Sequence, residues 1–251
     1  MSLSGKHVWL IGASEGIGAA LALALSKAGA NVVLSARNAI GLQSLYGQLA
    51  PANHLVVPLD VTDDVSVNAA WATINQQWPL VDMVIYNAGT YEPMDAQHFD
   101  LAKVERMVDV NFRGALRVLS TFLPAWIARG SGHIALVGSV AGYRGLPSAM
   151  GYGASKAAMI HLAENLKADL ANTDIAVQII NPGFVKTRLT EKNDFAMPCI
   201  ITPEAAADFI MNGLLSQTFE IHFPKRFSLF LKFLSLLPAS LYFALLKKYK
   251  F

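Results

Sequence analysis

The chain has 251 residues, 53% of them hydrophobic and 15% charged, and a formal net charge of +2 at neutral pH. This length is sufficient for one large domain with a sizeable core, and so small a net charge gives no indication of a nucleic-acid-binding surface. The single cysteine, Cys199, excludes an internal disulfide, and the six scattered histidines lack the cysteine companions of a metal site.

Short apolar runs alternate with longer helical patterns along most of the chain. Strands are predicted at 8–11, 32–35, 55–58, 83–86, 133–137 and 176–180, and helices at 17–28, 40–49, 65–77, 101–128, 152–171 and 203–216. This alternation predicts βαβ units and a parallel sheet that is buried on both faces. We therefore expect an α/β, doubly wound, Rossmann-like domain over 1–220, followed by an apolar, basic C-terminal extension over 221–251.

A glycine cluster lies between the first predicted strand and the first predicted helix. It contains Gly12, Ser14, Gly16, Ile17 and Gly18. Glycines permit a tight turn and a close approach of a phosphate to the backbone, and the start of a helix offers unpaired N–H groups to an anion. The cluster therefore predicts a dinucleotide site, although a glycine pattern alone is weak support.

The end of the second predicted strand indicates which dinucleotide is bound. Enzymes that use NAD usually place an acid here, to hold the ribose 2′-hydroxyl group. Ala36 offers no carboxylate, whereas the guanidinium of Arg37 suits a 2′-phosphate. We predict NADP as the cofactor; the alternative is that Arg37 is a solvated surface residue.

Two further strand ends carry candidate cofactor contacts. Asp60 and Val61 follow the third strand, where a carboxylate can accept a hydrogen bond from the adenine amino group or can form a turn or helix cap. Asn87, Ala88 and Gly89 follow the fourth strand, where small residues let the chain pass near a cofactor and Asn87 can tie adjacent strands together.

Tyr152 and Lys156 are four residues apart, so they share one face of a predicted helix, and Ser139 ends the fifth strand. A tyrosine with an ordinary pKa near 10 is a poor acid–base group at neutral pH, and a neighbouring ammonium group lowers that pKa. A serine hydroxyl can hydrogen-bond a substrate oxygen. The three residues predict proton transfer to or from a bound substrate.

Together these motifs resemble the short-chain dehydrogenase/reductase family, in its single-domain branch of about this length. The resemblance spans roughly 5–215 and rests on the glycine cluster, Asn87-Ala88-Gly89, Asn111, Ser139, Tyr152, Lys156 and Asn181-Pro182-Gly183. It implies that Tyr152 is the proton donor in ketone reduction and the base in alcohol oxidation. It also implies that Ser139 positions the carbonyl oxygen, that Lys156 binds ribose, and that Asn111 holds a water in a proton relay.

The segment after the sixth strand, with Pro182, Gly183, Val185 and Thr187, marks a turn at the carboxyl edge of the sheet. By the resemblance, Val185 and Thr187 meet the nicotinamide carboxamide. Two departures from the family are small. Tyr86 replaces an asparagine, and Glu15 stands where some NADP users carry a basic residue.

The loop after Thr187 is expected to cover the substrate. Its candidate walls are Leu189, Phe195, Met197 and Ile200, with Val140, Tyr143, Leu146 and Met150 opposite them. This apolar lining weakly favours a lipophilic carbonyl compound.

The C-terminal residues predict a partner of their own, because 221–251 contain six basic residues and no acidic one. Ser228, Lys232 and Ser235 form one polar stripe on an otherwise apolar helix, and Lys232 and Pro238 disfavour a membrane-spanning helix. We predict that 225–251 lie in a membrane interface, with Phe223, Phe227, Phe230, Phe233, Tyr242 and Phe243 as anchors and Lys247, Lys248 and Lys250 near anionic headgroups. The alternative is a helix pair that packs on the body, lies between subunits or closes the pocket.

The sequence thus predicts an NADP(H)-dependent oxidoreductase that interconverts an apolar carbonyl compound and a secondary alcohol. It has no charged-then-apolar leader, which favours the cytoplasm, with peripheral attachment to the inner face of a membrane. The resemblance implies a homo-oligomer, dimer or tetramer, formed through 101–128 and 152–171. The alternative function is an NADP-binding sensor or interaction protein that docks through its C-terminal residues.

Overall fold

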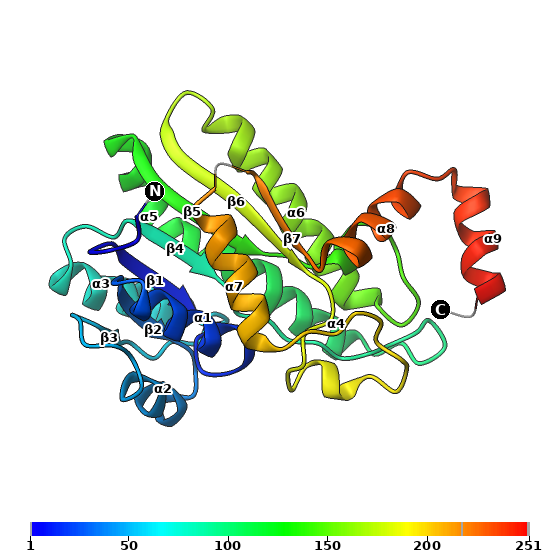
Figure 1. The fold of residues 1–251 in the computed structure, drawn as a ribbon, viewed down its shortest axis with the longest axis horizontal. Helices are drawn as coiled ribbons and strands as arrows, with labels where there is room; N and C mark the ends of the chain where they lie inside the picture. The colour runs from blue at the N-terminus through cyan, green and yellow to red at the C-terminus, as the bar shows by residue number, and fades with distance from the viewer. Residues whose placement is uncertain (1, 217, 250–251) are drawn as a thin grey trace.

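The computed structural model describes residues 2–216 and 218–249 and contains one seven-stranded parallel sheet (Figure 1). The strands are β1 (His7–Ile11), β2 (Asn31–Ser35), β3 (Leu55–Val56), β4 (Met83–Tyr86), β5 (Ser131–Val137), β6 (Asp174–Pro182) and β7 (Glu220–Phe223). Their order in the sheet is β3-β2-β1-β4-β5-β6-β7. The doubly wound fold is confirmed, but β7 was not predicted and takes the sheet three residues beyond the expected boundary at 220.

Helices cover both faces of the sheet. They are α1 (Gly16–Lys27), α2 (Ala39–Tyr46), α3 (Asp64–Gln77), α4 (Leu101–Val108), α5 (Gly114–Arg129), α6 (Met150–Asp169), α7 (Pro203–Leu214), α8 (Lys225–Ser235) and α9 (Ala239–Tyr249). The single helix predicted at 101–128 is interrupted, because Asp109–Arg113 form a π-helical segment between α4 and α5.

The period-two alternation of each strand divides the core into two layers. On β1, Trp9 and Ile11 pack with residues of α3, α5 and α6, whereas Val8 and Leu10 pack with residues of α1, α2 and α7. Because both faces are covered, the strands are apolar almost throughout. The sheet order reverses between β1 and β4, and ligands of open α/β sheets bind beyond the carboxyl ends of the strands at such a point.

Tyr86, one of the two departures from the family pattern, is buried at the end of β4. Its hydroxyl donates a hydrogen bond of 2.6 Å to the carbonyl oxygen of Val110, inside the π-helical segment. The side chain therefore joins the sheet to the segment that carries Asn111.

The C-terminal residues form a pair of helices, α8 and α9, at one end of the sheet, drawn from orange to red (Figure 1). This is the alternative in which the extension packs on the body. The predicted polar stripe of α8 faces the body: the hydroxyl of Ser228 lies 2.7 Å from Nδ1 of His222, and the ammonium of Lys232 is hydrogen-bonded to the carboxylate of Glu220. Arg144 donates to the carbonyl oxygens of Leu234, Ser235 and Leu237, and so caps the C-terminus of α8.

Three of the predicted membrane anchors are therefore wrong. Phe223 is a core residue of β7, and Tyr242 is buried, with its hydroxyl donating to the carbonyl oxygen of Gly145. Phe227 is half-buried against the body. Phe230, Phe233 and Phe243 are exposed, and Lys250 lies outside the described residues. Among the helices of residues 2–216 and 218–249, none is long and apolar enough to cross a membrane.

Candidate functional site

A cleft of about 730 Å³ lies at the carboxyl ends of the strands. Most of the predicted cofactor-binding residues line it: Gly12, Ser14, Gly16, Ile17, Arg37, Val61, Asn87, Ala88, Gly89, Tyr152, Lys156, Pro182, Gly183, Val185 and Thr187. Gly18 and Asp60 do not line it. Residues that are up to 175 positions apart in the chain thus surround one cavity, as the glycine and tyrosine motifs predict together.

Two glycines of the turn are required by close contacts. Gly12 has φ +85°, and a Cβ atom there would lie 2.6 Å from the backbone nitrogen of Ala88. At Gly18 a Cβ atom would lie 1.9 Å from the carbonyl oxygen of Gly12. Gly18 therefore packs against the backbone of the turn itself, and it does not line the cleft. The turn keeps the start of α1 open toward the cleft, as an anion site requires.

Asn87 and Asp60 have structural contacts. The amide of Asn87 donates to the carbonyl oxygen of Gly12 at 2.8 Å and so ties the β4 end to the glycine turn. The carboxylate of Asp60 accepts from the backbone and the hydroxyl of Thr62, which is the alternative turn role. Burial opposes ionisation of Asp60, but the hydrogen bonds from Thr62 and the charge of Arg37 bring its pKa below the ordinary value.

The cleft carries more positive than negative charge at its rim. Arg37 lines it beside β2, and Lys186 and Arg188 line it from the segment after β6. The sequence analysis did not single out these last two residues. Glu15 also lines the cleft, but its carboxylate forms a 2.7 Å ion pair with Arg188, so this acid does not stand alone near a bound phosphate.

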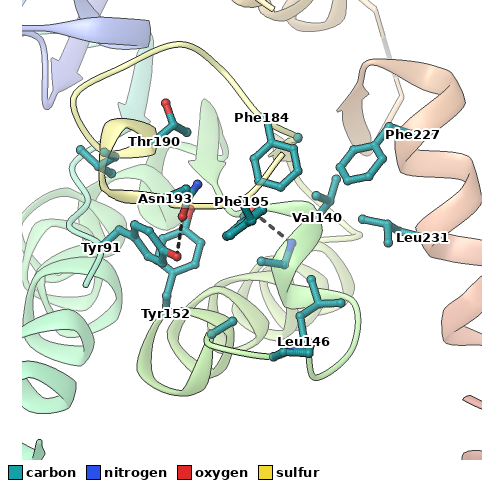
Figure 2. Close-up of a pocket in the computed structure, with 16 residues that line it drawn as sticks. Tyr91, Val140, Leu146, Tyr152, Phe184, Thr190, Asn193, Phe195, Phe227 and Leu231 are labelled. Atoms are coloured by element: carbon teal, nitrogen blue, oxygen red, sulfur yellow. Dashed lines mark hydrogen bonds between the residues drawn. The ribbon is translucent and has the colours of Figure 1, made fainter. Parts of the chain in front are cut away.

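A smaller pocket of about 130 Å³ adjoins the cleft (Figure 2). Ser139, Tyr152, Gly183, Leu189 and Thr190 line both cavities, so they stand where the two cavities meet. The remaining lining of the smaller pocket is mainly apolar. Its members are Tyr91, Val140, Ala141, Leu146, Pro147, Ala149, Phe184, Asn193, Phe195, Phe227 and Leu231.

Half of the residues predicted as substrate walls line this pocket. Val140, Leu146, Leu189 and Phe195 line the pocket. Four others do not: Met150 and Ile200 are exposed, Met197 lies elsewhere in the loop, and the hydroxyl of Tyr143 donates to Glu220 at 2.5 Å. Figure 2 shows Phe227 and Leu231, both from α8, on one side of the pocket and Tyr91 and Tyr152 on the other. Helix α8, for which the sequence predicts a position in a membrane interface, thus supplies part of the pocket wall.

Tyr152 lies in the first turn of α6. Its ring packs edge to face against the ring of Tyr91, with the two ring centroids 5.0 Å apart. Burial raises the pKa of the Tyr152 hydroxyl, and hydrogen bonding with Ser139 acts in the opposite direction. The expected lowering of this pKa by Lys156 is not found. The phenol is therefore protonated at neutral pH, which is the form that can donate a proton.

The amine of Lys156 is hydrogen-bonded to the backbone and not to the phenol of Tyr152. Its Nζ donates to the carbonyl oxygen of Val137 at 2.8 Å and lies 5.8 Å from the centre of the Tyr152 ring. The side chain is 4% exposed, and burial lowers the pKa of Lys156 to about 8. Burial without a charged partner disfavours the protonated form of the amine, so the pKa of Lys156 falls below its ordinary value.

This lowered pKa predicts a stability that rises with pH. Below pH 8 both the folded and the unfolded chain carry a charged Lys156, and the burial cost is fully present. Between pH 8 and about 10.4, the ordinary value, the unfolded chain binds more protons, so folding becomes more favourable by up to about 3 kcal/mol. Denaturant unfolding of the wild type and of Lys156→Met across this range measures it. The free energy of unfolding of the wild type minus that of Lys156→Met should be constant below pH 7 and rise above pH 8; a difference that is independent of pH contradicts the assignment.

Asn111 is fully buried in the π-helical segment, and its side chain makes three hydrogen bonds with protein groups. Its oxygen accepts from the backbone of Thr90 at 2.7 Å, and its nitrogen donates to the Thr90 carbonyl oxygen and to the hydroxyl of Ser155. These bonds join the β4 end to α6 directly beside Lys156. π-Helical segments often occur at functional sites, which agrees with this position.

Ser139 follows β5 and caps the short helical turn Val140–Gly142, because its hydroxyl accepts from the backbone nitrogen of Ala141 at 3.1 Å. The same hydroxyl lies 3.4 Å from the carbonyl oxygen of Pro182. The cap fixes the rotamer of Ser139 toward the junction of the two cavities.

A partly buried polar network joins this junction to α8. Glu220 on β7 accepts from Tyr143, from Asn181 at 2.8 Å, and from Lys232 of α8. A Cβ atom on Gly183 would lie 3.0 Å from the ring of Phe227. Phe227, which belongs to the wall of the smaller pocket on α8, therefore packs closely against Gly183, which lines both cavities.

Comparisons with known proteins agree with this geometry. A family model described as short chain dehydrogenase matches residues 6–197. An uncharacterized oxidoreductase of Myxococcus xanthus is 33% identical over 242 residues, which cover 96% of both chains. One of Staphylococcus haemolyticus is 35% identical over 212 residues, 84% of this chain and 92% of the relative.

Solved structures have the same fold. A closed form of serine dehydrogenase complexed with NADP+ is 26% identical, with a TM-score of 0.80, and covers 87% of this chain and 94% of its own. A short chain dehydrogenase/reductase from Burkholderia phymatum in complex with NAD has a TM-score of 0.83 at 21% identity, with 92% and 93% covered. In the part of the chain that the structure describes, no group of histidine, cysteine and acidic side chains is arranged to hold a metal ion.

Proposed function

The chain belongs to the short-chain dehydrogenase family of oxidoreductases, and we propose that it is an NADP(H)-dependent enzyme that interconverts an apolar carbonyl compound and a secondary alcohol. The observation that carries the proposal is the position of Ser139 and Tyr152, which line both the large cleft and the apolar pocket. A substrate carbonyl in the pocket would meet the proton donor at the boundary with the dinucleotide cleft.

Each site residue has a separate role in the proposed reaction. Tyr152 donates a proton to the carbonyl oxygen during reduction and accepts it during oxidation, while Ser139 hydrogen-bonds the same oxygen and stabilises its developing charge. The nicotinamide supplies or accepts the hydride when it is bound. Lys156 would hold the ribose beside Tyr152, and Asn111 keeps α6 in place through Ser155. Both N–H groups of the Asn111 amide already have protein partners, so a water of the proposed relay would have to bind Oδ1 or a backbone group.

The structure fits a dinucleotide at the cleft. A Cβ atom on Gly12 or Gly18 would close the turn, so these glycines leave room for a phosphate beside the start of α1. Arg37 and Lys186 would contact the ribose phosphate and the pyrophosphate, while Val185 and Thr187 would meet the carboxamide. Similar structures hold NADP+ in one case and NAD in another, so the preference for NADP depends on Arg37 and on Ala36, which offers no acid.

We predict that Arg37→Ala lowers kcat/KM for NADPH by about 10- to 100-fold and leaves that for NADH nearly unchanged, because a charge-assisted hydrogen bond to the 2′-phosphate contributes about 1.5–3 kcal/mol. Arg106→Ala, which removes an exposed arginine of α4, is the matched control and should have no effect. Steady-state kinetics with both cofactors measure it. Unchanged kinetics with both cofactors would assign Arg37 to the solvent instead, and equal losses with NADPH and NADH would assign it to a part that the two cofactors share.

The proposed activity itself is tested by carbonyl-dependent oxidation of NADPH across a panel of ketones and aldehydes of increasing chain length. Turnover that increases with apolar surface supports both the reaction and the substrate class. Turnover with none of the panel, by a protein that binds NADPH, would favour the nucleotide sensor. The assembled Ser139, Tyr152 and Lys156 argue against that alternative, because a sensor needs no proton donor.

The remaining proposals concern the assembly and its surroundings. A homo-oligomer would form through α4, α5 and α6, where Leu101, Leu116 and Ile127 are exposed. The lone cysteine favours the reducing cytoplasm, and Cys199 is exposed, as a free thiol there can be. We also propose peripheral attachment to a membrane surface through the C-terminal helices.

A further inference from the structure

Helix α8, its connection and α9 expose large apolar side chains on their outer side. Leu229, Phe230, Phe233, Leu236, Leu241 and Phe243 are each between 47% and 83% exposed, and we refer to these six residues as the docking face. Single exposed apolar residues are ordinary, but six within fifteen positions of one helix pair indicate a contact surface.

Helix α8 is apolar on its inner and on its outer side. Leu231, Leu234 and the ring of Phe227 pack against the body. The polar residues Ser228 and Lys232 also point inward, to partners on β7, whereas Phe230 and Phe233 point outward. Hydrogen bonds to His222 and Glu220, and the cap from Arg144, fix this orientation. A rotation that buried Phe230 and Phe233 would break the ion pair between Lys232 and Glu220, whose side chains are only partly exposed.

Positive charge accompanies the apolar residues. Lys225 and Arg226 at the start of α8 and Lys247 near the end of α9 are exposed, and residues 221–251 contain no Asp or Glu. Apolar side chains that insert below the headgroups, with lysines and arginines beside them, match the surface of an anionic bilayer.

We infer that the docking face binds the surface of an anionic lipid bilayer. The inference deepens the membrane attachment proposed above and revises its anchors to Phe230, Phe233 and Phe243. A second copy of the chain is a less suitable occupant, because a two-fold contact would bring two sets of basic residues together without acidic residues of 221–251 to pair with them.

The docking face lies close to the proposed substrate pocket. Phe227 and Leu231 line that pocket from the inner side of α8, whereas Phe230 and Phe233 lie on its outer side. One helix diameter, about 10 Å, therefore separates a docked bilayer from the pocket wall. An apolar carbonyl compound that is dissolved in the bilayer would have a short path to Tyr152.

The test is co-sedimentation of the full chain with vesicles of equal parts phosphatidylglycerol and phosphatidylcholine. The wild type should pellet with the vesicles, and the double variant Phe230→Ser/Phe233→Ser should bind at least about tenfold more weakly, because each phenylalanine contributes up to about 1.5–3 kcal/mol when fully buried. Lys225→Glu/Arg226→Glu should weaken binding to a similar degree, since each basic residue near an anionic surface contributes about 1 kcal/mol and the substitution reverses it.

The matched control is Ile40→Ser/Val65→Ser, which removes two exposed apolar residues at the opposite end of the molecule, on α2 and α3 (Figure 1). It should pellet like the wild type. A wild type that stays in the supernatant overturns the inference. If Phe230→Ser/Phe233→Ser converts a dimer to a monomer in sedimentation velocity while the wild type ignores vesicles, the face is a subunit contact.

Co-sedimentation needs no turnover, so the outcomes remain separable. A protein that pellets but does not oxidise NADPH with any carbonyl compound contradicts the proposed function alone. A protein that turns over but never pellets contradicts the docking alone.

Discussion

Tyr152→Phe should lower kcat/KM for carbonyl reduction by about 10³-fold, because it removes the only atom that the proposed reaction uses to protonate the substrate oxygen. Phenylalanine keeps the ring, and with it the edge-to-face contact with Tyr91 at 5.0 Å. The dissociation constant of NADPH, measured by fluorescence titration, should therefore change little. Steady-state rates with the best substrate of the carbonyl panel measure the loss.

Tyr91→Phe separates proton donation from pocket shape. It also removes a phenol hydroxyl from the pocket, one that is hydrogen-bonded to Asn193 at 2.8 Å. This variant should raise KM and change kcat by less than about tenfold, because Tyr91 only positions substrate and loop. If Tyr152→Phe keeps its kcat, or if the two variants lose it equally, Tyr152 is not the general acid.

Gly18→Ala should damage both the fold and cofactor binding. Its Cβ atom would meet the carbonyl oxygen of Gly12 at 1.9 Å and the amide of Asn87 at 2.7 Å, so the glycine turn or the start of α1 must move. Overpacking of this kind costs about 1–3 kcal/mol of unfolding free energy. A displacement of about 1 Å at the phosphate site would weaken NADPH binding by about 10²-fold.

Gly47→Ala is the control for the effect of a methyl group alone. Gly47 ends α2 with φ −64°, and the nearest atom to an added Cβ is the Ser44 carbonyl oxygen at 3.8 Å. Its stability and its affinity for NADPH should match those of the wild type. Urea unfolding and NADPH titration of both variants measure the difference. If Gly18→Ala keeps the urea midpoint and the NADPH affinity of the wild type, the glycine turn can move without loss of stability or binding, and the prediction is wrong.

The sheet and most of the cleft could be predicted because their signals are local. Apolar runs such as Val8–Ile11 end in glycine or small residues, and parallel strands bring all these ends to one edge. β7 could not be predicted in this way, since Glu220–Phe223 has only four residues and one apolar-polar alternation. It is a strand because Phe223 fills a space beside α7, and that space exists only after the chain has folded.

The direction of the α8 stripe illustrates a second limit. Periodicity shows that Ser228 and Lys232 share a face, but it does not show which face the molecule covers. The answer depends on Glu220 and His222, which precede the helix and provide partly buried partners for both residues. The available signal is an acid, Glu220, close in sequence to a helix whose polar stripe contains a lysine.

The pKa of Tyr152 shows a third limit. Four-residue spacing places Tyr152 and Lys156 on one helix face, yet the amine is bound to the Val137 carbonyl oxygen and burial determines the state of the phenol. The four-residue spacing determines that the two side chains are neighbours. Their hydrogen bonds depend on the strand that packs against the helix, here β5 with Val137.

The attachment of α8 to β7 has a consequence for biosynthesis. Every residue that lines the dinucleotide cleft has left the ribosome once the chain has passed Pro203, but Phe227 and Leu231 emerge later. Domains fold as units while synthesis proceeds. The lining of the cleft has therefore been translated before the apolar pocket gains the wall that Phe227 and Leu231 supply.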